Sequence, residues 1–293
     1  NDYDDLKRRK IKRWLPKNES DFYARDRPYS VKEIDQILDK CDIRDRVAVL
    51  IMVSTGMRIG GLRELQIGHI KRMDEYGLYL IWVYNLSGED RYYTFCSPEC
   101  AAAIDEYLAY RARLGEQLKH KSPLIRDKFS KDNYFKAPRF LSIRAMSLLF
   151  EEALKKAGVN QVKPGSGQKK RDIMRSHGFR KFFITQCDKA GISFTVREYL
   201  SGHRLPNQDR FYIKPSEEDR LAEYVKAIPL LTINDKQRLE QENHDLKTVQ
   251  AEDIAALKKK VDHVDAMMEA LKGAITAKSQ ASWIGLKDAL GWK

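Results

Sequence analysis

The sequence predicts a mostly helical α+β protein with a small antiparallel β-hairpin or sheet and a C-terminal coiled-coil helix. Three patterns support this class. Capped segments with apolar residues three and four apart recur along the chain, one stretch concentrates β-branched and aromatic residues around a turn, and a late segment carries a heptad. The chain has 293 residues, of which 42% are hydrophobic and 33% charged, so it can bury a core beneath solvated helices.

The first expected helices follow a basic arm over residues 1–29. Ser30 and Glu33 have the spacing of a capping box, which predicts a helix beginning at Ser30. A second helix is expected from about Asp45 to Thr55, and its nearly continuous apolar run indicates a buried position. A glycine, Gly56, should end it, and a further short helix should follow this break.

Two runs rich in β-branched and aromatic residues, Leu78–Tyr84 and Arg91–Phe95, flank a segment with turn chemistry, which predicts a β-hairpin. Five further helices are expected after it, with Ser97 and Ser176 as N-caps. They cover about residues 97–114, 142–158, 176–191, 194–200 and 216–227.

The composition shifts at about Asp235 to Lys, Glu, Gln, Asp, Ala and Leu. Apolar residues then recur at alternating steps of three and four, which predicts a coiled-coil seam within residues 235–273 and a short apolar tail over 274–293. The alternative is a single amphipathic helix packed on its own domain; we favour self-association. The seam residues are Ile254, Leu257, Val261, Val264, Met268 and Leu271.

The formal net charge is +12 and the pI is about 9.4, which favours a polyanionic partner such as nucleic acid. The plainer alternative is a basic protein without such a partner. The most basic internal stretch runs from residue 163 to residue 181. The candidate DNA contacts are Lys163, Lys169, Lys170, Arg171, Arg175, Lys181 and Arg204.

Cysteine usage and hydropathy exclude some classes of protein. Cys96 and Cys100 lie four residues apart, but no second Cys or His pair completes a zinc site, so we expect no metal and no cofactor. The four cysteines are expected to be reduced structural thiols. No apolar run approaches the ~20 residues that a membrane span requires, and the charged start lacks a signal-peptide core, so we expect a cytoplasmic protein.

Four short motifs carry the candidate chemistry. His177 and Arg180 lie three residues apart at an expected helix start, where the positive end of the helix dipole suits a phosphate. The guanidinium groups of Arg58 and Arg180 could bind the non-bridging oxygens of one phosphodiester. The Tyr212 hydroxyl could attack phosphorus, and a histidine could move the proton. The motifs are Thr55–Arg58, Ser176–Arg180, Leu200–Arg204 and Arg210–Pro215.

Each motif alone has a plainer interpretation. A His-x-x-Arg pair on a helix is more often a surface pair, and Arg58 could serve as a helix cap or a salt-bridge residue. Tyr212 is one of 14 tyrosines and by itself more often a packing residue. Gly202 and His203 could form an ordinary helix-ending turn. The inference therefore depends on the order and the settings of the four motifs together.

The ordered set resembles the tyrosine recombinases, also called phage-type integrases. That family carries an Arg in a Thr-Gly-x-Arg turn, a Lys on a β-hairpin, His-x-x-Arg, a Gly-His turn and a nucleophilic Tyr. The segments Tyr212–Pro215 and Leu230–Ile233 are most similar to archaeal integrases. The resemblance covers about residues 28–233 and implies the recombinase catalytic fold for residues 30–234. Residues 1–29 would be the linker after a missing DNA-clamping domain. The matching residues are Arg58, His177, Arg180, His203 and Tyr212.

The resemblance implies a site-specific DNA recombinase. Arg58 and Arg180 would hold the scissile phosphate, and His203 would bind it as well. His177 would serve as acid and base for Tyr212, which would form a 3′-phosphotyrosyl link without a metal or cofactor. The implied partner is double-stranded DNA, bound by a homo-oligomer, a tetramer on DNA, at the prokaryotic nucleoid and away from membranes.

Two positions depart from the family pattern. The hairpin lysine that protonates the leaving oxygen has no match, and Arg91, the only basic residue there, is a poor proton donor. The acidic residue three after the first Arg is replaced by Gly61. The loss of the lysine leaves a catalytically weakened DNA-binding accessory protein as an alternative. A type IB topoisomerase-like nicking and rejoining enzyme is a second, and a coiled-coil assembly module is a third.

Overall fold

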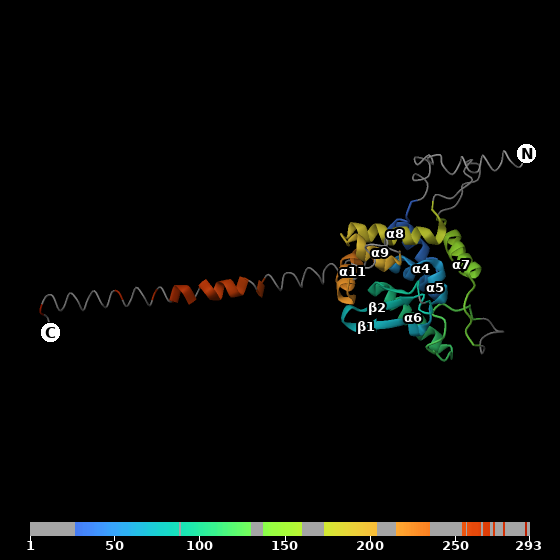
Figure 1. Ribbon diagram of the computed structural model, residues 1–293, viewed down its shortest axis with the longest axis horizontal. Helices are drawn as coiled ribbons and strands as arrows, with labels where there is room; N and C mark the ends of the chain where they lie inside the picture. Colours follow the sequence, from blue (N-terminus) through green and yellow to red (C-terminus); the bar gives the residue numbers. More distant parts are fainter. Residues whose placement is uncertain are drawn as a thin grey trace, which may run out of the picture. The chain divides into compact units, whose positions relative to one another are not determined.

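The computed structural model describes residues 27–87, 89–129, 137–159, 173–203 and 215–234, and residues 254, 255, 257–264, 266–269, 272, 278 and 291 of the C-terminal region. The chain divides into two compact units, Asn1–Arg238 and Leu239–Lys293. The described part of the first unit is mostly helical and holds one three-stranded antiparallel sheet (Figure 1). The expectation of a mostly helical α+β fold is therefore confirmed, whereas the finer division at residues 30, 235 and 274 stays a prediction.

Most of the described helices begin where a serine or aspartate caps them, because the side chain accepts a hydrogen bond from an otherwise unpaired backbone N–H. The helices of the first unit are α3 (Val31–Leu38), α4 (Ile43–Thr55), α5 (Ile59–Glu64), α6 (Pro98–Arg113), α7 (Ile143–Lys156), α8 (Arg175–Lys189), α9 (Phe194–Ser201) and α11 (Glu217–Leu231). The strands are β1 (Ile70–Met73), β2 (Leu78–Val83) and β3 (Tyr92–Phe95), and the 3₁₀ turns are η1 (Ile67–His69) and η2 (Asp74–Tyr76).

Helix α4 forms the centre of the core. Its residues 47–53 are all buried, and α6, α7 and α8 pack against it (Figure 1). The helix ends at Gly56, which takes the left-handed conformation with φ +61°. The Tyr224 hydroxyl on α11 donates to the carbonyl of Ser54 at 2.8 Å, so the last helix of the unit is held against the end of α4.

The sheet has the order β1-β2-β3 with antiparallel pairs throughout. The predicted hairpin is confirmed, with Ile81 opposite Thr94 and Val83 opposite Tyr92. Strand β1 was not expected, because it is four residues long and its two central residues, Lys71 and Arg72, are charged and exposed. The hairpin thus places β3 beside α9, and the end of α9 carries part of the candidate site.

Some expected helix boundaries are wrong. Ser176 does not cap α8; the N-cap position is Met174, and Ser176 lies within the first turn. A tertiary contact holds this start, because Arg175 donates to the Glu151 carboxylate on α7 at 3.0 Å. Helix α11 continues four residues beyond Ala227, since its apolar face remains in contact with the core.

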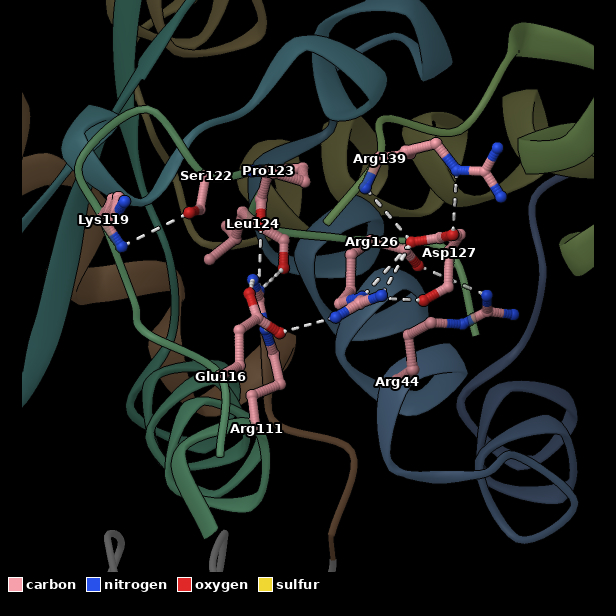
Figure 2. Close-up of polar contacts among 10 residues, drawn as sticks. All are labelled: Arg44, Arg111, Glu116, Lys119, Ser122, Pro123, Leu124, Arg126, Asp127 and Arg139. Atoms are coloured by element: carbon pink, nitrogen blue, oxygen red, sulfur yellow. Dashed lines mark hydrogen bonds and ion pairs between the residues drawn. The ribbon is translucent and has the colours of Figure 1, made fainter. Parts of the chain in front are cut away.

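A buried ion network fixes the segment after α6 (Figure 2). The guanidinium groups of Arg111 and Arg126, which are 0% and 1% exposed, contact the two carboxylate oxygens of Glu116 at 2.5 and 2.9 Å. Arg111 also donates to the carbonyls of Pro123 and Leu124, both at 2.9 Å. The sequence suggests that these charged side chains are solvated. Instead they are buried beneath the segment after α6 and bind it through hydrogen bonds.

We expect Glu116→Gln to lower the free energy of unfolding by about 3–5 kcal/mol, because it leaves two buried guanidinium groups without their shared carboxylate. Urea unfolding at pH 7 measures this change. The matched control is Glu106→Gln on the exposed face of α6, which should stay within about 0.5 kcal/mol of the wild type. Equal effects of the two substitutions would contradict a stabilising role of the network.

The same carboxylate predicts acid sensitivity. Burial opposes ionisation of Glu116, but the hydrogen bonds from Arg111 and Arg126 outweigh it and hold its pKa below the ordinary value. A lowered folded-state pKa gives stability that is present above the ordinary glutamate pKa of about 4.3 and is lost as the pH falls through the lower, folded-state pKa. In Glu116→Gln, this loss of unfolding free energy at low pH should be absent.

The described residues of the second unit between 254 and 272 are helical. The described apolar side chains of the seam are about half exposed, from 52% for Val264 to 58% for Leu257. This agrees with the expected helix, whereas its pairing stays a prediction. Most of the expected apolar tail lies outside the described residues. Within the described residues, no helix is long and apolar enough to span a bilayer.

Candidate active site

The turn after α4 presents the first candidate arginine. Thr55 Oγ1 accepts a hydrogen bond from Met57 N at 3.2 Å, and the left-handed Gly56 reverses the chain between them. Arg58 follows in extended conformation at the N-cap position of α5, with an exposed side chain. Its Nη1 donates to the carbonyl of Gly202 at 3.3 Å. The turn therefore directs Arg58 to the end of α9.

Arg180 lies in the first part of α8 and is 2% exposed. Its Nη1 donates to the carbonyls of Gly56 at 2.5 Å and Ser201 at 2.7 Å, so one guanidinium joins the ends of α4 and α9. Its Nη2 is buried and makes no hydrogen bond to any described residue. Burial, and next the charge of Arg58, lower the pKa of Arg180. Two guanidinium groups are thus held close together, and no carboxylate of the described residues is bound directly to either.

His203 follows the left-handed Gly202, the C-cap of α9 with φ +64°. A side chain at position 202 would place its Cβ 2.3 Å from Tyr92 Cε1, so the turn requires glycine on both counts. The His203 backbone N–H donates to the Glu198 carbonyl at 2.9 Å. Its Nδ1 lies 2.9 Å from Glu198 Oε2 and 3.1 Å from Ser201 Oγ. The imidazole is therefore fixed through Nδ1.

The electrostatics of this site favour a neutral imidazole. Burial lowers the pKa of His203, and the Arg180 and Arg58 charges act in the same direction. The Glu198 carboxylate opposes them but does not restore the ordinary value. An anion bound between the two guanidinium groups would offset their charge and so raise the pKa of His203.

His177 lies in the first turn of α8, three residues before Arg180, with an exposed side chain. Of the expected DNA contacts, Arg175 is exposed and paired with Glu151, and Lys181 is half-buried. The nucleophile candidate and the remaining expected contacts lie outside the described residues. These are Tyr212, Lys163, Lys169, Lys170, Arg171 and Arg204.

A family model described as the phage integrase family matches residues 29–219, more than half of the chain. The chain belongs to the phage integrase family. No curated protein sequence matches it. The solved structures that this integrase-family chain resembles include XerA recombinase, at 19% identity and a TM-score of 0.46 over 68% of this chain and 62% of that one.

The integrase from mycobacterium phage Brujita is similar at 14% identity and a TM-score of 0.47, over 73% of this chain and 62% of that one. The lambda integrase catalytic core is similar at 20% identity and a TM-score of 0.41, over 61% of this chain and 96% of that one. This phage integrase family member thus spans less than two thirds of the XerA and Brujita chains.

The hairpin of this integrase-family chain carries no lysine in β2, β3 or the described residues between them. Arg91 lies with its guanidinium carbon 4.3 Å from the centre of the Trp82 ring. On β1, Arg72 pairs with the Asp105 carboxylate at 2.7 Å. The hairpin lysine of the family pattern, which the sequence lacks, is therefore not replaced by another lysine in the described part of the hairpin.

The structure adds site residues that the motifs did not indicate. Tyr84, which directly follows β2, and Tyr92, the first residue of β3, have ring centres 6.4 Å apart and lie near Arg58. Burial raises the pKa of both hydroxyls, against the opposing charge of Arg58. Glu198 is the third addition. Its position five residues before His203, across a glycine cap, is a signal that could have indicated it.

The described site residues are suited to holding an anion. Arg58 and Arg180 donate to the carbonyls of Gly202 and Ser201 at the end of α9, and His203 directly follows this turn. The described residues contain no group of three or more His, Cys, Asp or Glu side chains close enough to hold a metal ion.

Proposed function

We propose that this protein is a site-specific DNA recombinase or integrase that cleaves and rejoins duplex DNA through a 3′-phosphotyrosyl intermediate on Tyr212. The observation that carries the proposal is the buried Nη2 of Arg180, which makes no hydrogen bond to any described residue and lies beside Arg58 and His203, with the Tyr92 hydroxyl also close to the guanidinium. A buried donor of this kind is costly unless a ligand satisfies it. A phosphodiester supplies the acceptor.

The proposed transition state gathers negative charge on the two non-bridging oxygens of a pentacoordinate phosphorus. Arg180 is immobilised by two carbonyls, so it can donate to one oxygen without reorganising. Arg58 can donate to the other, and His203, which follows the Gly202 turn, can add a third donor once its imidazole is protonated. Donors fixed in this way stabilise the transition state more than the ground state.

In the proposed reaction the Tyr212 oxygen forms a bond to phosphorus, and the bond from phosphorus to the 5′-oxygen breaks. His177 takes the tyrosine proton, for which its exposed place one turn before Arg180 is suitable. The leaving 5′-oxygen takes a proton from a general acid other than a lysine of the described hairpin, which carries none. Attack by a 5′-hydroxyl of a partner strand reverses the step, so strands are exchanged without ATP.

The proposed partner is double-stranded DNA, consistent with the net charge of +12. The basic stretch from residue 163 to residue 181 would track the phosphate backbone, as would Arg204. We also propose that the protein acts as a tetramer on DNA at the prokaryotic nucleoid. These contacts would make binding strongly dependent on salt.

The test is covalent trapping on a nicked duplex that carries the target site and loses its 5′-hydroxyl fragment after cleavage. We expect a protein–DNA adduct that survives denaturation and joins the protein to a 3′-phosphate. Salt-sensitive binding without an adduct at any pH would favour the accessory-protein alternative. Relaxation of supercoils without a defined site would favour the topoisomerase-like alternative.

We further propose that the C-terminal helix pairs with a second copy of the chain. Its described seam side chains are more than half exposed, which is unfavourable unless a partner covers them. Val261→Asp places a charge on the seam and should lower the mass measured by sedimentation. His263→Asp adds the same charge two residues away, on an exposed position, and should not. An unchanged mass in Val261→Asp would contradict pairing.

A further inference from the structure

Glu198 lies in the last turn of α9 and holds His203 twice. Its carbonyl accepts the His203 backbone N–H at 2.9 Å, and its carboxylate Oε2 lies 2.9 Å from His203 Nδ1. The Glu198 side chain is 16% exposed, and its other oxygen lies 3.8 Å from Arg197 Nε. Backbone and side chain of one residue therefore fix both the position and the rotation of the imidazole.

The Glu198 carboxylate also favours the protonated forms of two groups of the site. It raises the pKa of Arg180 and of His203, against larger effects in the opposite direction. Arg58 and Arg180 face His203 from the start of α5 and from α8, and Tyr92 covers Gly202 from β3. A carboxylate in this position counters two guanidinium charges that would otherwise repel an imidazolium.

Helix α5 cannot supply this carboxylate from the position three residues after Arg58. Position 61 is glycine, and a Cβ there would lie 2.6 Å from Val83 Cγ1 and 3.6 Å from Tyr84 Cζ. The strand β2 and the Tyr84 ring therefore fill the space that a longer side chain would need. The acidic group of the site comes from α9.

Ser201 supports the same orientation. Its Oγ donates to the Glu198 carbonyl at 3.2 Å and lies 3.1 Å from His203 Nδ1. Because this hydroxyl proton points to the carbonyl, the Ser201 oxygen is left to accept at Nδ1. Two acceptors at Nδ1 place the proton of the neutral imidazole there.

We propose that Glu198 is a positioning residue: its carboxylate holds the Nδ1 proton of His203, so that Nε2 faces the scissile phosphate and takes up a proton from solvent when the phosphate binds. The imidazolium then donates from Nε2 to the phosphate and from Nδ1 to Glu198. This inference rests on the proposed function for the identity of the anion. The orientation of the free imidazole does not depend on it.

The first measurement uses ¹⁵N-histidine NMR of the full chain without DNA, with the His203 signals assigned through His203→Asn. We expect the neutral wild-type imidazole to carry its proton on Nδ1. In Glu198→Gln the His203 titration should move to lower pH, because Arg180 and Arg58 then act unopposed. The control is Asp188→Asn, which removes an exposed carboxylate bound to the same Arg197 and should leave the titration unchanged.

The second measurement is the pH profile of adduct formation on the nicked duplex. Glu198→Gln should slow it about ten- to a hundredfold at neutral pH and recover part of the rate at lower pH, where the imidazolium is regained. Glu198→Asp keeps the negative charge, so its rate of adduct formation should lie between those of the wild type and Glu198→Gln. This variant replaces Glu198→Gln in the measurement if Glu198→Gln does not fold.

A proton on Nε2 in the neutral wild type would overturn the inference, as would equal His203 titrations in Glu198→Gln and Asp188→Asn. Failure of the wild type to form any adduct would instead contradict the proposed function. The NMR measurement would still decide the role of Glu198 in that case.

Discussion

A Tyr212→Phe variant is expected to form no covalent adduct with DNA. Phenylalanine lacks the oxygen that would bond to phosphorus, and no other change to the ring or to the cationic site accompanies the substitution. DNA binding should therefore stay near the wild-type level at equal salt, since it depends on phosphate contacts. Trapping on the nicked duplex measures the adduct, and fluorescence anisotropy measures binding.

The control for this substitution is Tyr76→Phe, which removes a hydroxyl from an exposed tyrosine on η2. Tyr84 and Tyr92 are the competing nucleophiles, because both lie near Arg58. The raised pKa of both hydroxyls lowers the fraction of each that is present as the nucleophilic phenolate at a given pH. An adduct that survives in Tyr212→Phe and is mapped by peptide mass to Tyr84 or Tyr92 would overturn the assignment.

Local signals made most of the described helices predictable. A capping serine or aspartate and the spacing of apolar residues lie within a few positions of each other, so the sequence alone carries them. The start of α8 was not predictable in this way, because the ion pair between Arg175 and Glu151 joins residues 24 positions apart. Strand β1 was missed because its pairing with β2, rather than its own composition, makes it a strand.

The motifs predicted which side chains to examine at the site but not how they are held. Arg58, Arg180 and His203 are brought together by the carbonyls of Gly56, Ser201 and Gly202, and the contact between Arg180 and Gly56 spans 124 positions.

Tyr92 reaches the site only because the hairpin packs on the end of α9. Long-range packing of this kind leaves no local pattern. The buried Arg111 and Glu116 were missed for the same reason, since the sequence favours solvent exposure for both types of residue.

Arg180→Lys is expected to reduce the rate of adduct formation about 100- to 1,000-fold. The arginine uses Nη1 for two carbonyls and keeps Nη2 for the phosphate, which a planar fork permits. A single ammonium group cannot occupy both places. The ammonium could donate to the two carbonyls, and then the phosphate would lose its donor. Alternatively it could donate to the phosphate, and then the hydrogen bonds that connect the ends of α4 and α9 would be lost. Loss of one fixed donor to a charged transition state has the stated magnitude.

The measurement is the single-turnover rate of adduct formation at saturating DNA, with urea unfolding of the same samples. Arg113→Lys at the exposed end of α6 is the control for the exchange of one cation for another, and it should cleave at the wild-type rate. A stable Arg180→Lys variant that also cleaves normally would mean that a positive charge suffices at this position. The buried Nη2 would then have no role in catalysis, and the phosphate would have to be held by Arg58 and His203 alone.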